Sequence, residues 1–138
     1  MTMTNQEIFD TVYKGIIAQG GGSHEGSQCV YRHPENGRKC AAGWLIPDEL
    51  YLPAFEFKNV SKIVSEHHQL TTLWSRAQDS FVYQCQKVHD QSVYDSATLS
   101  DTDSYSMVYS DEKFLEIFKT KMAVLALTYN LVVPEMLK

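Results

Sequence analysis

Side chains that could carry chemistry are concentrated between residues 29 and 51. This stretch holds two cysteines, Cys29 and Cys40, on either side of a predicted turn. A thiol becomes a nucleophile when a base takes its proton and a third group orients that base. One interpretation is therefore a small cysteine hydrolase that uses Cys40, His89 and Asp90. Against it, His89 and Asp90 are neighbours in a predicted helix, where adjacent side chains point in different directions.

Metal binding is a second interpretation of the same region. His24, Cys29, His33 and Cys40 have ligand types that zinc prefers, and would make a structural zinc domain with a protein partner. They lack the close Cys-x2-Cys or His-x3-His pairs of such sites. Free cysteines are more often small buried core residues, which is the simpler explanation. The sequence therefore predicts reduced, buried cysteines and no metal or other cofactor.

Cations and aromatic side chains in this stretch indicate a third interpretation, a binding site. The candidate binding residues are Tyr31, Arg32, Arg38, Lys39 and Trp44. Such groups can hold a phosphate and stack a base. The alternative is a solvated hairpin edge, where charged side chains prevent aggregation. Because basic residues that crowd together repel one another, we expect an anionic partner, and we expect function to need Arg32 and Lys39 but not Cys40.

The stretch also resembles a group of small bacteriophage and prophage proteins. They share a Cys-x-Tyr-Arg segment, a glycine turn, then Lys-Cys-Ala-x-Gly and Leu-Ile-Pro-Asp-Glu-x-Tyr, and a later His-Asp pair. The matching residues are Cys29, Tyr31, Arg32, Gly37, Lys39, Cys40, Ala41, Gly43, Leu45, Ile46, Pro47, Asp48, Glu49, Tyr51, His89 and Asp90. The resemblance covers about the first 90 residues in patches. It implies a phage-type accessory protein in the host cell cytoplasm, with counter-defence as its setting, and brings no activity.

Local patterns predict the elements that position these residues. A helix begins after Thr4, which heads a capping box, and ends at three consecutive glycines from Gly20. Residues 28–32 and 38–43 should form a β-hairpin around an Asn-Gly turn, with His33 opposite Cys40 if the loop has two residues and Tyr31 opposite Cys40 if it has four. Further helices are expected over residues 60–66 and 72–89, and a last one after Ser110.

Residues 90–110 are rich in serine, aspartate and threonine and hold no lysine or arginine. They predict a long polar loop or flap. The acidic positions at 101–112 do not make a calcium loop, because Ser106 stands where glycine is required. The whole chain, residues 1–138, is expected to be a single α+β domain, mostly helical, with three to four helices around one β-hairpin.

Composition excludes several classes of function. Twelve basic and 17 acidic side chains give a net charge of −5, which argues against general nucleic-acid binding. The longest apolar run, residues 122–127, is too short to cross a membrane, no secretory signal is evident, and an odd cysteine count does not suggest a secreted disulfide framework. We therefore expect a cytoplasmic, non-catalytic protein that binds a host protein or other host macromolecule, or a small anionic nucleotide. Whether it forms a homo-oligomer stays open.

Overall fold

The helices and strands form a mostly helical α+β fold, as the sequence predicts. The structure is a computed structural model that describes residues 2–26, 28–99 and 107–136. Its α-helices are α1 (Asn5–Gln19), α2 (Ala41–Leu45), α3 (Val60–Glu66), α4 (Asp79–Asp95) and α5 (Asp111–Tyr129). Short 3-10 turns cover Pro53–Phe55, His68–Thr72 and Arg76–Gln78. Two antiparallel strand pairs are β1 (His24–Glu25) with β2 (Gln28–Cys29), and β3 (Ala97–Leu99) with β4 (Met107–Tyr109).

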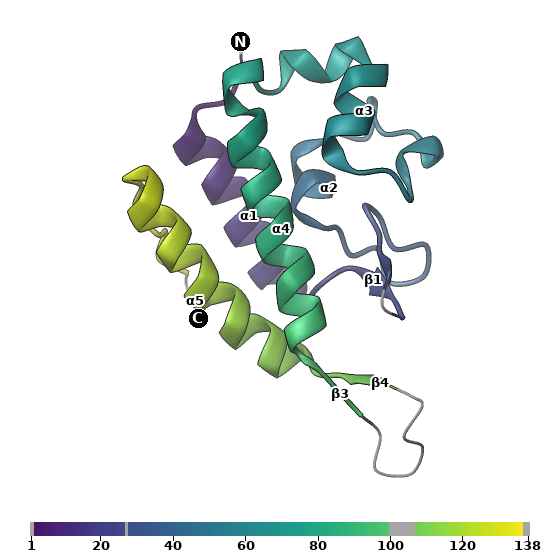
Figure 1. The fold of residues 1–138 in the computed structure, drawn as a ribbon, viewed down its shortest axis with the longest axis vertical. Helices are drawn as coiled ribbons and strands as arrows, with labels where there is room; N and C mark the ends of the chain where they lie inside the picture. Colours follow the sequence, from purple (N-terminus) through teal and green to yellow (C-terminus); the bar gives the residue numbers. More distant parts are fainter. Residues whose placement is uncertain (1, 27, 100–106, 137–138) are drawn as a thin grey trace.

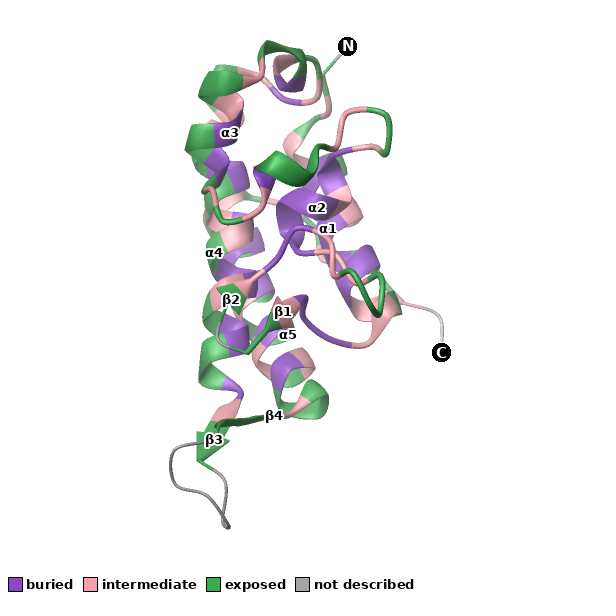
Figure 2. Cartoon of the chain, turned by 90° about the vertical axis from the view of Figure 1, so that its right-hand side faces the viewer, coloured by how far each residue is buried: buried purple, intermediate pink, exposed green. Residues whose placement is uncertain are grey.

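Helix α4 is the central element of the molecule. It contacts α1, α2, α3 and α5, and the three long helices lie side by side (Figure 1). The short helix α2 packs against α1 and α4 and is almost wholly buried, whereas the β3–β4 ribbon projects with exposed residues from the end of the helical body (Figure 2). One side of α4 therefore closes the core, and its other side remains available to solvent.

Helix α1 begins and ends where its local sequence predicts. The Thr4 hydroxyl accepts the Glu7 N–H at 3.1 Å, and the Glu7 carboxylate accepts the Thr4 N–H at 2.9 Å. Gly20 ends the helix with φ of +89°, a conformation that glycine adopts without a Cβ clash. The side chains of Asn59 and Ser110, which precede α3 and α5, also accept backbone N–H groups. These signals are local, so sequence alone could read them.

The expected hairpin around the Asn-Gly turn is reduced to a single bridge, between Arg32 and Lys39. Its four-residue register is correct, because the Cys40 N–H donates to the Tyr31 carbonyl at 3.4 Å. The prediction of a second strand over residues 38–43 was wrong, because residues 41–45 form α2. Alanines favour a helix, and the N–H of Ala42 donates to a side chain of α4.

The expected loop over residues 90–110 is also shorter than predicted. Helix α4 continues to Asp95, and β3 and β4 pair beyond it with Ala97 opposite Tyr109. The middle of the expected flap, residues 100–106, lies outside the described residues. His89 and Asp90 are therefore inside a helix and not at its end, so the predicted helix boundary at residue 89 was wrong.

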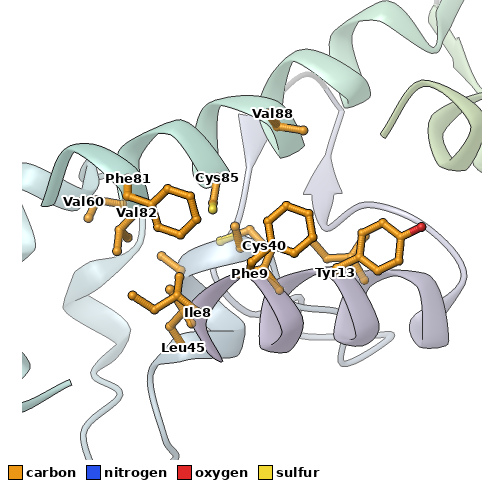
Figure 3. Packing of buried hydrophobic residues seen from close by; sticks show 14 of the residues in the cluster. Ile8, Phe9, Tyr13, Cys40, Leu45, Val60, Phe81, Val82, Cys85 and Val88 are labelled. Carbon is orange, nitrogen blue, oxygen red and sulfur yellow. The ribbon is translucent and has the colours of Figure 1, made fainter. Parts of the chain in front are cut away.

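The core fills the space between α1, α2, α4 and α5. Figure 3 shows Cys40 and Cys85 among apolar side chains such as Phe9 and Phe81. Both cysteines are buried, as expected, whereas Cys29 is only half-buried, and all three thiols are free. No helix of the described residues is long and apolar enough to cross a membrane.

Candidate functional site

A pocket of about 450 Å³ opens on the solvent side of α4. Its other walls are the segment of residues 28–31, which contains β2, and the loop of residues 57–60 that leads into α3. We call it the α4 pocket. Of the five predicted binding residues, Tyr31 alone lines it, together with Cys29, Cys40 and Asp90 from the other two interpretations.

One face of α4 forms the longest wall of the pocket. Tyr83, Lys87, Asp90 and Tyr94 all line it and follow one another at steps of four, three and four residues. Residues at these steps share a helix face. Tyr94 is 77% exposed, so a large aromatic ring meets solvent here. The wall therefore combines aromatic rings with both signs of charge.

The opposite wall is held in place by Glu56. Its carboxylate accepts the backbone N–H groups of Tyr31 and Arg32 at 2.8 and 3.1 Å, and the Tyr51 hydroxyl at 2.6 Å. The Tyr31 hydroxyl in turn donates to the Lys58 carbonyl at 2.5 Å. These bonds fasten the loop of residues 57–60 beside residues 31–32, so this wall is rigidly attached to the rest of the fold.

Phe57 lies in this loop with φ of +67° and with 75% of its surface exposed. A large side chain in the left-handed region costs about 1 to 3 kcal/mol, and such residues cluster at binding and active sites. No core packing of Phe57 offsets that cost, because its ring lies at the mouth of the pocket and not in the apolar cluster.

The Asp90 carboxylate is anchored at the base of the helix wall. The buried Ser23 N–H donates to His89 Nε2 at 3.0 Å, so Nε2 carries no proton. His89 Nδ1 therefore holds the ring proton and donates it to Asp90 Oδ1 at 2.9 Å. Gln86 Nε2 donates to the same oxygen at 2.7 Å. Contrary to the sequence-based argument, the neighbouring His89 and Asp90 side chains do meet.

Both thiols of the pocket are held protonated. Burial, and then the negative charge of Asp90, raises the pKa of Cys29 well above its ordinary value. Burial raises the pKa of Cys40 to about 12. A thiol is a weak nucleophile compared with its thiolate, so neither residue is activated.

The hydrogen bonds of His89 therefore do not allow it to act as a base for Cys40. His89 Nε2 already accepts a backbone N–H, and Nδ1 has its proton directed at Asp90, so no lone pair of the ring is available to deprotonate Cys40. This arrangement positions the carboxylate of Asp90 instead of activating a nucleophile. The geometry consequently gives no support to Cys40, His89 and Asp90 as catalytic residues.

The four residues of the zinc interpretation do not form one ligand cluster either, although His24 and Cys29 are paired between β1 and β2. His24 Nδ1 faces the Gly26 carbonyl at 3.0 Å, and His33 Nδ1 accepts N–H groups of its own turn. Cys29 instead has ligand atoms of His89 and Asp90 near it, all within 4.8 Å of one another. A metal on His89 Nδ1 would need the proton on Nε2, where the Ser23 N–H already points. The residues of this cluster do not fit a metal ion in the observed arrangement.

The two arginines near the turn form ion pairs with other side chains of the protein. Arg32 pairs with Asp48 at 2.6 Å and lies 4.4 Å above the Tyr51 ring. Arg38 makes two bonds to Asp111, at 2.9 and 3.0 Å. Each of these two arginines therefore has its own acidic partner, which removes the argument from their mutual repulsion.

Lys39 and Trp44 belong to a different surface from the pocket. Lys39 Nζ lies 4.8 Å from the centre of the Trp44 ring, and the indole N–H donates to Gln19 at 3.1 Å. Apart from Tyr31, the predicted binding residues thus do not converge on one site.

The comparisons with known proteins add no relative. No family model, curated protein or solved structure matches the chain. The resemblance to phage proteins therefore remains an expectation that rests on the residues quoted above.

Sequence reasoning missed most of the pocket. Tyr83, Lys87 and Tyr94 could have been found together with Asp90, because their spacing puts them on one helix face. Phe57 and Lys58 carried no comparable signal. Their place depends on the bonds of Glu56 and Tyr31, which join residues 24 to 27 positions apart.

Proposed function

We propose that the protein is a non-catalytic accessory protein that binds a small anionic nucleotide in the α4 pocket. The observation that carries this proposal is a pocket lined by exposed aromatic rings, two lysines and a carboxylate that the protein holds in place. Its volume is in the range usual for small-molecule sites. The phage-type origin, the counter-defence setting and the host cytoplasm remain part of the proposal and rest on the resemblance.

Aromatic rings at the mouth of the pocket favour a planar ligand. Phe57, Tyr83 and Tyr94 come from both walls, and all three are substantially exposed. Stacking of a base on such a ring contributes about 1 to 3 kcal/mol. A macromolecular partner would need a flat surface instead of a pocket. Binding of a host protein over these rings would replace this proposal.

Two lysines at the rim favour an anionic ligand. Lys58 Nζ contacts Glu66 at 3.1 Å, and the pair is partly exposed. Lys87 has no salt-bridge partner among the described residues. Glu66 and Asp90 balance the two lysines in net charge, so the attraction for a phosphate comes from Lys87, the lysine without a salt-bridge partner among the described residues.

The test is isothermal titration of the protein with the four ribonucleoside monophosphates and the four matching nucleosides. We expect at least one monophosphate to bind more tightly than its nucleoside. Lys87→Ala should lower the affinity for the monophosphate by about tenfold or more, since a charge-assisted contact contributes about 1.5 to 3 kcal/mol. The same variant should leave the affinity for the nucleoside almost unchanged, because the nucleoside has no phosphate that Lys87 could contact.

Lys119→Ala is the matched control, because Lys119 is exposed on α5 and lies outside the pocket. It should bind every ligand like the unmodified protein. Absence of binding by all four monophosphates would overturn the proposal, as would an equal loss of affinity in Lys119→Ala and Lys87→Ala.

A further inference from the structure

We infer that the α4 pocket selects a guanine base, which Asp90 recognises through the N–H groups of the base. This inference rests on the proposed function, because it assumes that a nucleotide occupies the pocket. Its starting point is the carboxylate of Asp90, which lines the pocket and is 44% exposed although its anchor His89 is fully buried.

The hydrogen bonds of Asp90 leave it able to accept from a ligand. His89 and Gln86 both donate to Oδ1, and the protonated Cys29 thiol is a third group that hydrogen-bonds the carboxylate. An ionised carboxylate has about four acceptor positions and no donor. The second oxygen, Oδ2, thus retains acceptor capacity, while the chain from Ser23 through His89 fixes the carboxylate plane before any ligand arrives.

A fixed carboxylate discriminates among the four bases by their hydrogen-bonding edges. Guanine presents two N–H donors next to each other, at N1 and at the exocyclic amine. Adenine and cytosine place an unprotonated ring nitrogen beside their amine, and that acceptor would repel a carboxylate. Uracil has one N–H between two carbonyl oxygens, which would do the same. Once a bound base covers the Asp90 carboxylate, leaving that carboxylate without a donor is costly, so this difference becomes selectivity.

The pocket also has donors for the guanine carbonyl. Asn59 and Gln91 line it. The Asn59 Oδ1 atom already accepts the Lys62 N–H at 2.8 Å, which directs its amide nitrogen elsewhere. An amide N–H can therefore serve the O6 oxygen while Asp90 serves N1 and the amine. Lysines at the rim remain for the phosphate.

The experiment compares guanosine, inosine and adenosine monophosphates by isothermal titration of the unmodified protein. Inosine keeps the N1 donor and O6 of guanine but lacks the exocyclic amine. We expect guanosine monophosphate to bind at least about tenfold more tightly than adenosine monophosphate, with inosine monophosphate between them. This series needs no variant, so it cannot fail through misfolding.

Asp90→Asn then tests the residue itself, after circular dichroism shows that it folds. The amide oxygen of asparagine can still accept the His89 proton. Its N–H groups no longer favour the N–H donors of guanine, so the guanine preference should fall to about twofold or less. Asp95→Asn, also on α4 but paired with Lys121 away from the pocket, should keep the preference.

The outcomes separate the two proposals. Adenosine monophosphate that binds as well as guanosine monophosphate overturns the guanine inference and leaves nucleotide binding intact. A guanine preference that survives in folded Asp90→Asn likewise removes Asp90 as its cause. If none of the three nucleotides binds, the proposed function falls and the inference falls with it.

Discussion

Phe57 combines an unfavourable backbone conformation with an exposed aromatic ring. Neither property helps the fold, because a left-handed conformation costs energy and an exposed ring buries little apolar surface. The loop could turn at the same place with a glycine at no steric cost. The physical reason to keep a ring here lies in what the ring contacts when the pocket is filled.

Phe57→Gly should stabilise the protein while it weakens ligand binding. Relief of the left-handed conformation favours the folded state, and the greater freedom of unfolded glycine offsets part of this gain. We expect the free energy of unfolding to rise by about 0.5 to 1 kcal/mol in urea titrations. Nucleotide affinity should fall by about 1 to 3 kcal/mol, the contribution of one stacked base.

Phe57→Ala is the control for the backbone effect. Alanine removes the ring but keeps a Cβ at positive φ, so it should lose affinity to a similar extent without the gain in stability. A loss of stability in Phe57→Gly would show that the ring supports the fold, and the interpretation of Phe57 as a ligand contact would then be wrong.

At the scale of elements, the sequence was informative where a signal and its effect lie within a few residues. The capping box of α1, the glycine end at Gly20 and the serine cap of α5 are all local, and all were predicted correctly. The strand expected at residues 38–43 failed because α4 and α2 decide that conformation through Gln86 and Ala42, 44 positions apart. The candidate site was predicted only in part for the same reason: Cys29, Tyr31, Cys40 and Asp90 were named, but the loop that faces them was not.

The packing of α1 on α2 depends on the absence of a side chain at Gly15. A Cβ at this position would come within 2.6 Å of Trp44 ring atoms. Gly15→Ala should therefore destabilise the protein by about 1 to 3 kcal/mol, since overpacking forces the ring or the helix to move. Intrinsic helix propensity predicts the reverse, a gain of about 1 kcal/mol.

Chemical denaturation followed by circular dichroism distinguishes these two signs. Lys14→Ala, at the exposed neighbouring position of the same helix, should change the free energy of unfolding by about 0.5 kcal/mol or less. If Gly15→Ala is the more stable protein, the close approach of Trp44 to α1 is contradicted.

At the scale of the whole molecule, burial of ionisable groups makes stability depend on pH. Burial raises the pKa of both Cys40 and Cys85 to about 12, whereas an unfolded thiol titrates near 9. Between these values the unfolded chain has lost protons that the folded protein keeps. The contribution is thus fully present below pH 9 and is lost as the pH rises toward 12.

We expect Cys40 and Cys85 together to lower the free energy of unfolding by about 4 to 5 kcal/mol between pH 9 and pH 11, at about 1.4 kcal/mol per thiol and pH unit. Urea titrations at half-unit steps measure the slope. Cys85→Val removes one titrating group at similar volume. It should reduce the slope of unfolding free energy against pH by the contribution of one thiol. A flat profile from pH 8 to pH 10.5 would contradict the burial of these thiols in solution.

The first helix is bonded to a residue near the far end of the described chain. Gln6 donates to the Val132 carbonyl at 2.8 Å and accepts the Val132 N–H at 3.0 Å, across 126 positions of sequence. Helix α1 also contacts α4 and α5, both of which follow it by more than 50 residues. During synthesis on the ribosome, the part of α1 that α4 and α5 cover therefore emerges long before these two helices, although α2 follows α1 closely. That part of α1 stays uncovered until α5 and Val132 have been translated.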